Sequence, residues 1–123
     1  MTIYPWQKKN WKSLLYNLEN LAQAYIFYGP IGLGINDFAK NFSHSLLCKN
    51  LTNHQLPCGN CVDCEWLKTY HPDLITIDPI SFEGKDKQIA VDDIRSIKEF
   101  LSLSSHQPNG KKIVVIYDAQ RFN

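Results

Sequence analysis

The stretch that decides the fold is AYIFYGPIGLGIN, residues 24–36. Its first part, residues 24–28, is an apolar and aromatic run that predicts a short buried strand. A glycine-rich turn follows, and apolar residues at helical spacing then predict a helix from about residue 35 to residue 48. A strand, a glycine turn and a helix in this order are typical of an α/β domain.

Similar elements lie on both sides of this stretch. Residues 5 to about 20 carry apolar side chains at helical offsets, and a short helix is predicted near residues 62–69. A third helix opens at residue 92, with Ile94, Ile97 and Leu101 expected to face inward. Residues 74–78 and 112–118 predict strands. This alternation predicts an α/β fold with a mainly parallel sheet.

Composition narrows the class of protein. The chain has 123 residues, 44% of them hydrophobic, and a net charge of +1, as expected for one small soluble domain. The charge gives no basic field of the kind that a stand-alone nucleic-acid binder carries. No apolar stretch approaches the roughly 20 residues of a membrane span, and no secretory signal follows the N-terminal lysines. We expect a cytoplasmic protein, with residues 81–87 as an exposed loop.

The glycine-rich turn stands where a phosphate-binding loop would stand, between a predicted strand and a predicted helix. Its glycines, Gly29, Gly32 and Gly34, would allow close backbone approach, and the helix N-terminus offers N–H groups to an anion. In a working loop the next two residues are Lys and then Ser or Thr, which bind phosphate and magnesium. Here they are Ile35 and Asn36. The alternative is that the glycines only make a tight turn.

The missing contacts are large enough to matter. Each charge-assisted contact contributes roughly 1.5–3 kcal/mol, and the loss of both would move a micromolar ATP site to roughly millimolar affinity. A second site of matching type supports the phosphate-loop interpretation: the β-branched run that ends at Asp118 has the form of a Walker B strand, whose carboxylate supports magnesium. Ala119 follows, where many ATPases place a glutamate that activates water. We therefore expect no useful binding of Mg-ATP and no catalysis.

Four cysteines form the second motif. Cys48, Cys58, Cys61 and Cys64 have the spacing C-x9-C-x2-C-x2-C. Two-residue gaps let neighbouring thiolates converge on one ion, and four thiolates satisfy the tetrahedral preference of zinc. In a cytosolic protein such a cluster favours metal binding over disulfides. The sequence predicts a structural zinc site with no open coordination position.

Other interpretations of the cysteines remain. An iron–sulfur cluster is the main rival, although no Cys-Pro follows at the expected spacing. A disulfide pair would need an oxidising compartment, and a catalytic thiol would need an acid–base partner that the sequence does not assign. His54 could replace one ligand, but it is better interpreted as an exposed loop residue, since four cysteines complete the shell.

Together these motifs resemble one family. A degenerate phosphate loop, a zinc module after the next helix and an incomplete Walker B strand are similar to the clamp-loader subunits of bacterial DNA polymerase III, and among them to the delta-prime branch. Tyr4-Pro5-Trp6 and His71-Pro72-Asp73 also resemble segments of that branch. Ile35 and Asn36 favour it over the ATP-hydrolysing tau/gamma branch.

The resemblance implies an incomplete P-loop NTPase domain of the AAA+ type. It further implies delta and tau/gamma subunits as partners, DNA contact through the assembly, and a non-catalytic role in loading the sliding clamp onto primed DNA.

The chain also departs from the family. A Ser-Arg-Cys segment, whose arginine reaches a neighbour's ATP site, would follow Asn123, and so would the strand that completes the sheet. Without that strand the sheet exposes unpaired backbone edges. We therefore expect residues 1–123 to be the N-terminal part of an AAA+ clamp-loader domain, with the zinc module at about residues 48–70. No residue present takes the role of the arginine.

Two other functions remain open. One is an active P-loop ATPase subunit of the tau/gamma type, which Ile35, Asn36 and Ala119 oppose. The other is a zinc-ribbon nucleic-acid-binding module, to which a net charge of +1 gives little support. An ATP titration separates the first from an inert subunit, and a salt-dependent DNA-binding assay separates the second.

Overall fold

The computed structural model describes most of the chain. It describes residues 3–16, 18, 21–22, 24–30, 32–77, 91–103 and 111–117, with side chains from residue 94 onward in the helix that begins at 91. Asp118, Ala119 and the predicted loop at 81–87 lie outside the described residues. The chain divides into two compact units, residues 1–68 and 69–123.

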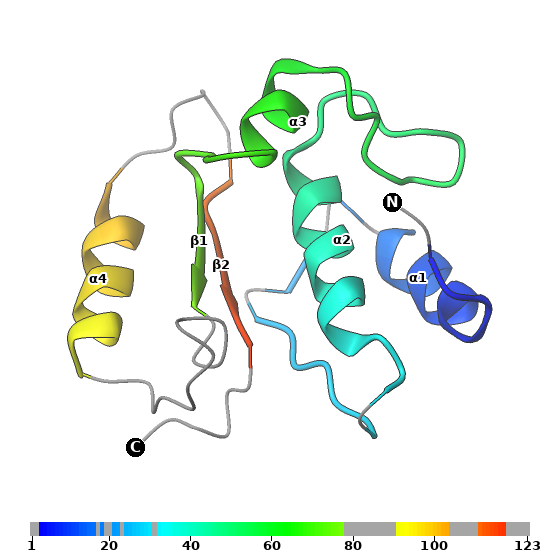
Figure 1. Ribbon diagram of the computed structural model, residues 1–123, viewed down its shortest axis with the longest axis horizontal. Helices are drawn as coiled ribbons and strands as arrows, with labels where there is room; N and C mark the ends of the chain where they lie inside the picture. The colour runs from blue at the N-terminus through cyan, green and yellow to red at the C-terminus, as the bar shows by residue number, and fades with distance from the viewer. Residues whose placement is uncertain are drawn as a thin grey trace. The chain divides into compact units, whose positions relative to one another are not determined.

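The first unit is helical in its described part. A 3₁₀ helix η1 (Pro5–Gln7) leads into α1 (Lys8–Leu15), and α2 (Ile35–Leu47) and α3 (Val62–Leu67) follow (Figure 1). Proline suits the start of η1 because its missing N–H is one that the first turn leaves unpaired. The helices predicted at residues 35–48 and near residues 62–69 are confirmed to within two residues at their ends, and the helix predicted from residue 5 to about 20 is confirmed as far as Leu15.

An aromatic cluster forms the core of this unit. Trp11 and Leu15 of α1 are buried together with Phe38 and Phe42 of α2. The Trp11 and Phe38 rings meet edge to face, with centroids 5.5 Å apart and planes at 86°, an arrangement that aromatic quadrupoles favour. These residues lie on the helix faces that their 3.6-residue spacing predicts. Partly buried side chains pack around this cluster: Ile3, Leu14, Leu18, Leu21, Phe27, Leu46 and Leu56.

The predicted strand at residues 24–28 is wrong. The structure leaves these residues without strand pairing. Tyr25 and Phe27 face the core, where both rings meet Phe42 edge to face, whereas Ile26 and Tyr28 are 85% and 89% exposed. A strand requires a neighbour that accepts its backbone hydrogen bonds, and the described residues of the first unit supply none. The segment therefore keeps the alternation of a strand but lacks its ladder and its burial.

The second unit contains a βαβ arrangement. Strands β1 (Leu74–Ile77) and β2 (Ile113–Ile116) are parallel, in register from Leu74 opposite Ile113 to Ile77 opposite Ile116. Helix α4 (Val91–Ser102) lies between them in sequence and beside β1 in space (Figure 1). Bonds from Ile113 N to Asp73 O and from Tyr117 N to Ile77 O extend the ladder at both ends. The predicted parallel sheet and α/β arrangement are thus confirmed for these two strands.

The inward face of α4 differs from the prediction at its last turn. Ile94 and Ile97 are half-buried as expected, but Leu101 is 54% exposed and Phe100 is half-buried instead. The reason lies in Lys112, whose Nζ is 4.2 Å from the centroid of the Phe100 ring and donates to the Phe100 carbonyl. The Lys112 ammonium thus lies over the Phe100 ring. The apolar periodicity of α4 alone cannot predict this contact, because Lys112 lies outside the helix.

Within the described part of the chain, no helix combines the length and apolar character that crossing a bilayer requires.

Candidate metal centre and glycine loop

The four cysteines converge at the C-terminal end of α2. Cys48 is the C-cap of α2, and Cys61 is the N-cap of α3. Cys64 lies in the first turn of α3, and Cys58 lies in the loop that joins the two helices. Their four sulfur atoms all lie within 4.8 Å of one another. Among the described residues this is the one group of potential metal ligands that the structure brings together, and His54 is not part of it.

The distances between the sulfurs test whether an ion fits. Cys48 and Cys58 sulfurs are 3.6 Å apart, and the Cys58–Cys64 and Cys48–Cys61 pairs are each 3.9 Å apart. Four ligands at a zinc–sulfur distance of about 2.3 Å define a tetrahedron with edges of about 3.8 Å. A disulfide would bring two sulfurs to about 2.05 Å, and all four thiols are free. The set can therefore hold a tetrahedral metal ion.

Backbone N–H groups point at the sulfurs. Cys48 Sγ accepts from the N–H groups of Asn50 and Cys58, both at 3.3 Å. Cys58 Sγ accepts from Asn60 and Cys61 at 3.4 and 3.3 Å, and Cys61 Sγ accepts from Cys64 at 3.4 Å. A thiolate accepts such bonds better than a thiol does, because the charge strengthens them. The turns that the short spacing creates thus stabilise the anionic form that binds metal.

The left-handed glycine in the loop makes one of these turns. Gly59 has φ +77° and follows Cys58 directly. A side chain in that backbone conformation costs roughly 1–2 kcal/mol. Glycine lets the chain turn so that the N–H of Asn60 returns to Cys58 Sγ.

The pKa values of the four thiols diverge for physical reasons. The N–H of Asn60, more than any other group, lowers the pKa of Cys58 to about 6. Burial opposes ionisation of Cys61, but N–H groups of Lys49 and Cys64 outweigh it and lower its pKa. Burial raises the pKa of Cys48, and it raises that of Cys64 to about 12. Ionisation of all four thiols therefore needs a cation among them.

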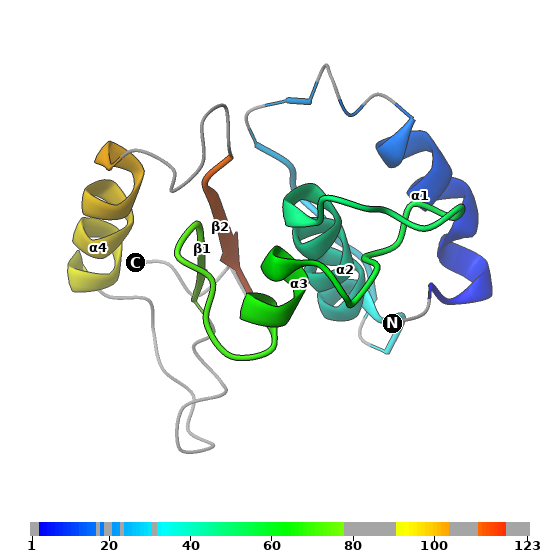
Figure 2. The ribbon, with the colours of Figure 1, turned by 90° about the horizontal axis from the view of Figure 1, so that it is seen from above.

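The loop before the cysteines is fastened to both long helices. Trp11 Nε1 donates to the His54 carbonyl at 3.0 Å, and Gln55 Nε2 donates to the Leu15 carbonyl at 3.0 Å. Ser45 Oγ donates to the Gln55 carbonyl at 3.1 Å. Figure 2 shows this loop reaching from α2 to α1. These supporting residues were missed from sequence, because nothing in their spacing shows a contact across 40 positions.

Gln55 has a further unusual property. Its φ of +62° is the one positive value among the described residues other than glycine. Such a conformation costs free energy for an L-residue and persists where surrounding contacts fix it. Here its side chain and its carbonyl each hold a different helix. Gln55 therefore anchors the cysteine loop.

The glycine loop begins α2 as the sequence predicts. Gly34 is the N-cap of α2 in the left-handed conformation, and Gly32 also has a positive φ of +95°. Ile35 opens the helix with its side chain against Gly29, since a Cβ on Gly29 would lie 3.0 Å from Ile35 Cδ1. Asn36 is exposed. The structure thus brings the loop glycines and the two substituted positions together, whereas Asp118 lies outside the described residues.

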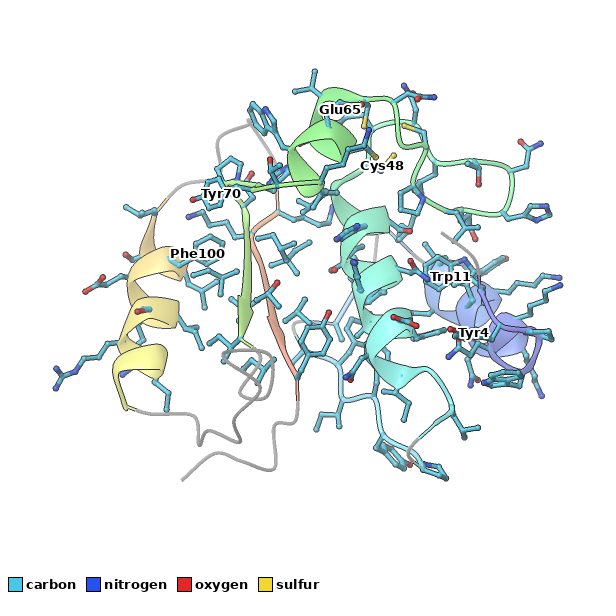
Figure 3. All side chains as sticks on the ribbon, in the orientation of Figure 1. Tyr4, Trp11, Cys48, Glu65, Tyr70 and Phe100 are labelled. Carbon is cyan, nitrogen blue, oxygen red and sulfur yellow. The ribbon has the colours of Figure 1, made fainter. Side chains whose placement is uncertain are left out.

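The N-terminal segment covers this loop. Trp6 Nε1 and Gln7 Nε2 each donate to the Leu33 carbonyl at 2.9 Å, and Gln7 Nε2 also donates to the Gly34 carbonyl at 3.0 Å. The Tyr4 hydroxyl donates to Asp37 Oδ2 at 3.1 Å. This bond, and then the negative charge of Asp37, raise the pKa of Tyr4. The loop and the metal centre therefore lie at opposite ends of α2, as the labelled Tyr4 and Cys48 show (Figure 3).

Comparison with known proteins identifies the family. A sequence model described as DNA polymerase III, delta subunit, matches residues 6–123. DNA polymerase III subunit delta' of Pseudomonas aeruginosa is 34% identical over 98% of this chain, and the protein of the same name from Haemophilus influenzae is 30% identical over 97%. Protein STICHEL-like 1 of Arabidopsis thaliana is 29% identical over 78% of the chain and 8% of its own length.

The two bacterial relatives are longer proteins. The chain spans 35% of the length of each. The family model, in contrast, extends over nearly the whole chain, including the cysteine loop, the glycine loop and both strands. This chain therefore belongs to the family described as DNA polymerase III, delta subunit.

Proposed function

We propose that this chain belongs to a non-catalytic clamp-loader subunit of DNA polymerase III, which helps to load the sliding clamp onto primed DNA during replication. The observation that carries the proposal is the glycine loop of a delta-subunit family member with Ile35 and Asn36 at its two functional positions. A clamp-loader role follows from the family and from relatives named subunit delta'. The inert character follows from the loop.

The loop lacks the groups that bind ATP and magnesium. Ile35 places an aliphatic side chain against Gly29 where a working loop has a lysine that reaches the phosphates. Asn36 has no hydroxyl to hold magnesium. At roughly 1.5–3 kcal/mol for each charge-assisted contact, these losses alone weaken ATP binding by about a hundredfold or more. ATP hydrolysis in the assembly would therefore fall to other subunits.

The metal centre has a structural role in this proposal. We assign zinc to Cys48, Cys58, Cys61 and Cys64, because the sulfur separations match a tetrahedron around one ion. In an iron–sulfur cluster the four cysteines are shared among two or more irons, and so their four sulfurs cannot all stand as close together as around one ion. Zinc supplies two positive charges that hold four thiolates together. With four protein ligands no position is left for substrate, so the site is not hydrolytic.

The partners follow from the same family. We propose that the subunit assembles in the cytoplasm with delta and tau/gamma subunits and contacts DNA through that assembly. Residues 1–123 would then form part of an AAA+ domain, with the zinc module at about residues 48–70. A net charge of +1 supports assembly, rather than independent DNA binding, as the main task of this region.

Reconstitution tests the proposal. The protein made from its complete gene is mixed with the delta and tau/gamma subunits of its own organism, and clamp loading onto primed DNA is measured. We expect a stable complex that loads the clamp when only tau/gamma can hydrolyse ATP. Failure to assemble would refute the family role. ATP turnover by this protein alone would refute the inert site and favour an active ATPase of the tau/gamma type.

A further inference from the structure

The N-terminal segment Tyr4-Pro5-Trp6-Gln7 folds over the start of α2. We propose that these four residues, here called the N-terminal cover, are an autoinhibitory element that blocks phosphate binding at the glycine loop. This inference rests on the proposed function and deepens it. The loop would be closed in two independent ways, by the loss of its phosphate-binding side chains and by an occupant from the same chain.

The Tyr4 ring blocks the approach to Gly34 sterically. A Cβ placed on Gly34 would lie 2.5 Å from Tyr4 Cε2 and 2.7 Å from Tyr4 Cδ2. The tyrosine ring therefore rests directly on the backbone of the N-cap glycine. In a phosphate-binding loop, glycine serves to let a ligand approach the backbone closely. Here the space over Gly34 is filled by an aromatic ring.

Trp6 and Gln7 hold the Tyr4 ring in place. Trp6 stacks on Tyr4 with ring centroids 5.0 Å apart and planes 2° from parallel. The Trp6 indole and the Gln7 amide both donate to the Leu33 carbonyl, and Gln7, which is buried, also donates to Gly34. The cover is thus tied to the backbone of the loop itself.

The charge of Asp37 opposes a second anion at the start of α2. The N-terminus of a helix favours an anion, and in α2 that anion is the Asp37 carboxylate in the first turn. The Tyr4 hydroxyl donates to this carboxylate. A phosphate group arriving at the same helix end would meet a like charge, which disfavours its binding. Asp37 therefore already places a negative charge at the helix terminus that a nucleotide would otherwise use.

The experiment separates the effect of the lost phosphate-binding side chains from the effect of the N-terminal cover. In the protein made from its complete gene, Ile35→Lys with Asn36→Thr restores the missing phosphate and magnesium ligands. Tyr4→Ala is then added on that background, and affinity for Mg-ATP is measured by calorimetry for both proteins. Tyr4→Phe on the same background is the matched control, because it keeps the ring and removes only the hydroxyl. Circular dichroism melting shows that each variant is folded.

We expect the restored loop alone to bind Mg-ATP no better than the unmodified protein, and the addition of Tyr4→Ala to raise the affinity at least tenfold. Tyr4→Phe should leave binding weak. Equal affinity with and without Tyr4→Ala would overturn the proposal, whether both proteins bind or neither does. If Tyr4→Ala lowers the melting temperature severely, Trp6→Ala replaces it, because Trp6 is 57% exposed. The same tenfold criterion then applies.

Failure of this inference and failure of the proposed function give different results. The ratio of the two restored-loop affinities tests only the cover. The proposed inert role is tested by the unmodified protein, in which Mg-ATP turnover would refute it regardless of that ratio.

Discussion

Substitution of Gly34 by alanine tests the close contact between the cover and the loop. The new Cβ would be 2.5 Å from the Tyr4 ring, closer than real Cβ contacts come, and the backbone there has φ +77°. The left-handed conformation costs roughly 1–2 kcal/mol for an L-residue. Forcing an extra methyl into a filled space costs about 1–3 kcal/mol more. We expect the free energy of unfolding to fall by about 2–5 kcal/mol in all.

Gly32 provides the matched control. Its φ is +95°, but a Cβ there meets nothing within 4 Å. Gly32→Ala therefore incurs the backbone cost without the steric one, about 1–2 kcal/mol. The entropy that alanine removes from the unfolded chain is similar at both positions and cancels in the comparison. The difference between the two variants, about 1–3 kcal/mol, measures the contact with Tyr4.

The assay is urea denaturation of zinc-saturated protein, followed by circular dichroism. A double-mutant cycle adds Tyr4→Ala to each glycine variant. Tyr4→Ala should restore stability in the Gly34→Ala background relative to the Gly32→Ala background, because the clash is removed. If Gly34→Ala and Gly32→Ala destabilise the protein equally, or if Tyr4→Ala has the same effect in both backgrounds, the reasoning about the cover is refuted.

Three further predictions concern the cysteine loop. Chelation should remove about one zinc per chain and a stabilisation on the order of 10 kcal/mol, seen as lost helical circular dichroism; stoichiometric iron in the purified protein would contradict the zinc assignment. Cys61→Ser should abolish stoichiometric metal, whereas His54→Ala, at an exposed residue outside the cluster, should retain it in elemental analysis; metal loss in the histidine variant would contradict the four-cysteine site. Gln55→Ala leaves the Leu15 carbonyl without its amide donor and should lower the free energy of unfolding in urea by about 1–3 kcal/mol. The exposed control Asn53→Ala should change it by no more than about 0.5 kcal/mol. Equal effects of the two substitutions would contradict an anchoring role for Gln55.

The features that sequence predicted correctly are local ones. The helices follow from apolar spacing, and Phe38 and Phe42 lie buried on the expected face of α2. The convergence of Cys58, Cys61 and Cys64 follows from two-residue gaps, whose turns bring the sulfurs of Cys58 and Cys61 to the N–H of a residue two or three positions later. In each case the interacting groups are separated by a few residues, so the local spacing of residues is enough to predict how they are arranged.

The features that sequence missed depend on distant partners. Residues 24–28 have the composition of a buried strand, but Ile26 and Tyr28 are exposed, because pairing requires a neighbour that no local pattern specifies. The Tyr4 contact with Asp37 joins positions 33 residues apart. Tyr4 and Trp6 entered the sequence argument only through a resemblance, without a role. Contacts of this kind are decided by the fold as a whole, and single-sequence periodicity does not report them.

The bond between Trp11 and the His54 carbonyl has an optical consequence. Of the three tryptophans, Trp11 is buried, with 3% of its surface exposed, and its indole donates to the cysteine loop, whereas Trp6 and Trp66 are 57% and 40% exposed. An indole in an apolar environment emits at shorter wavelength than one in water. Loosening of the loop would therefore expose the Trp11 ring to water and shift its fluorescence to longer wavelength. Trp11 fluorescence thus offers a direct measurement of metal binding at the proposed zinc site.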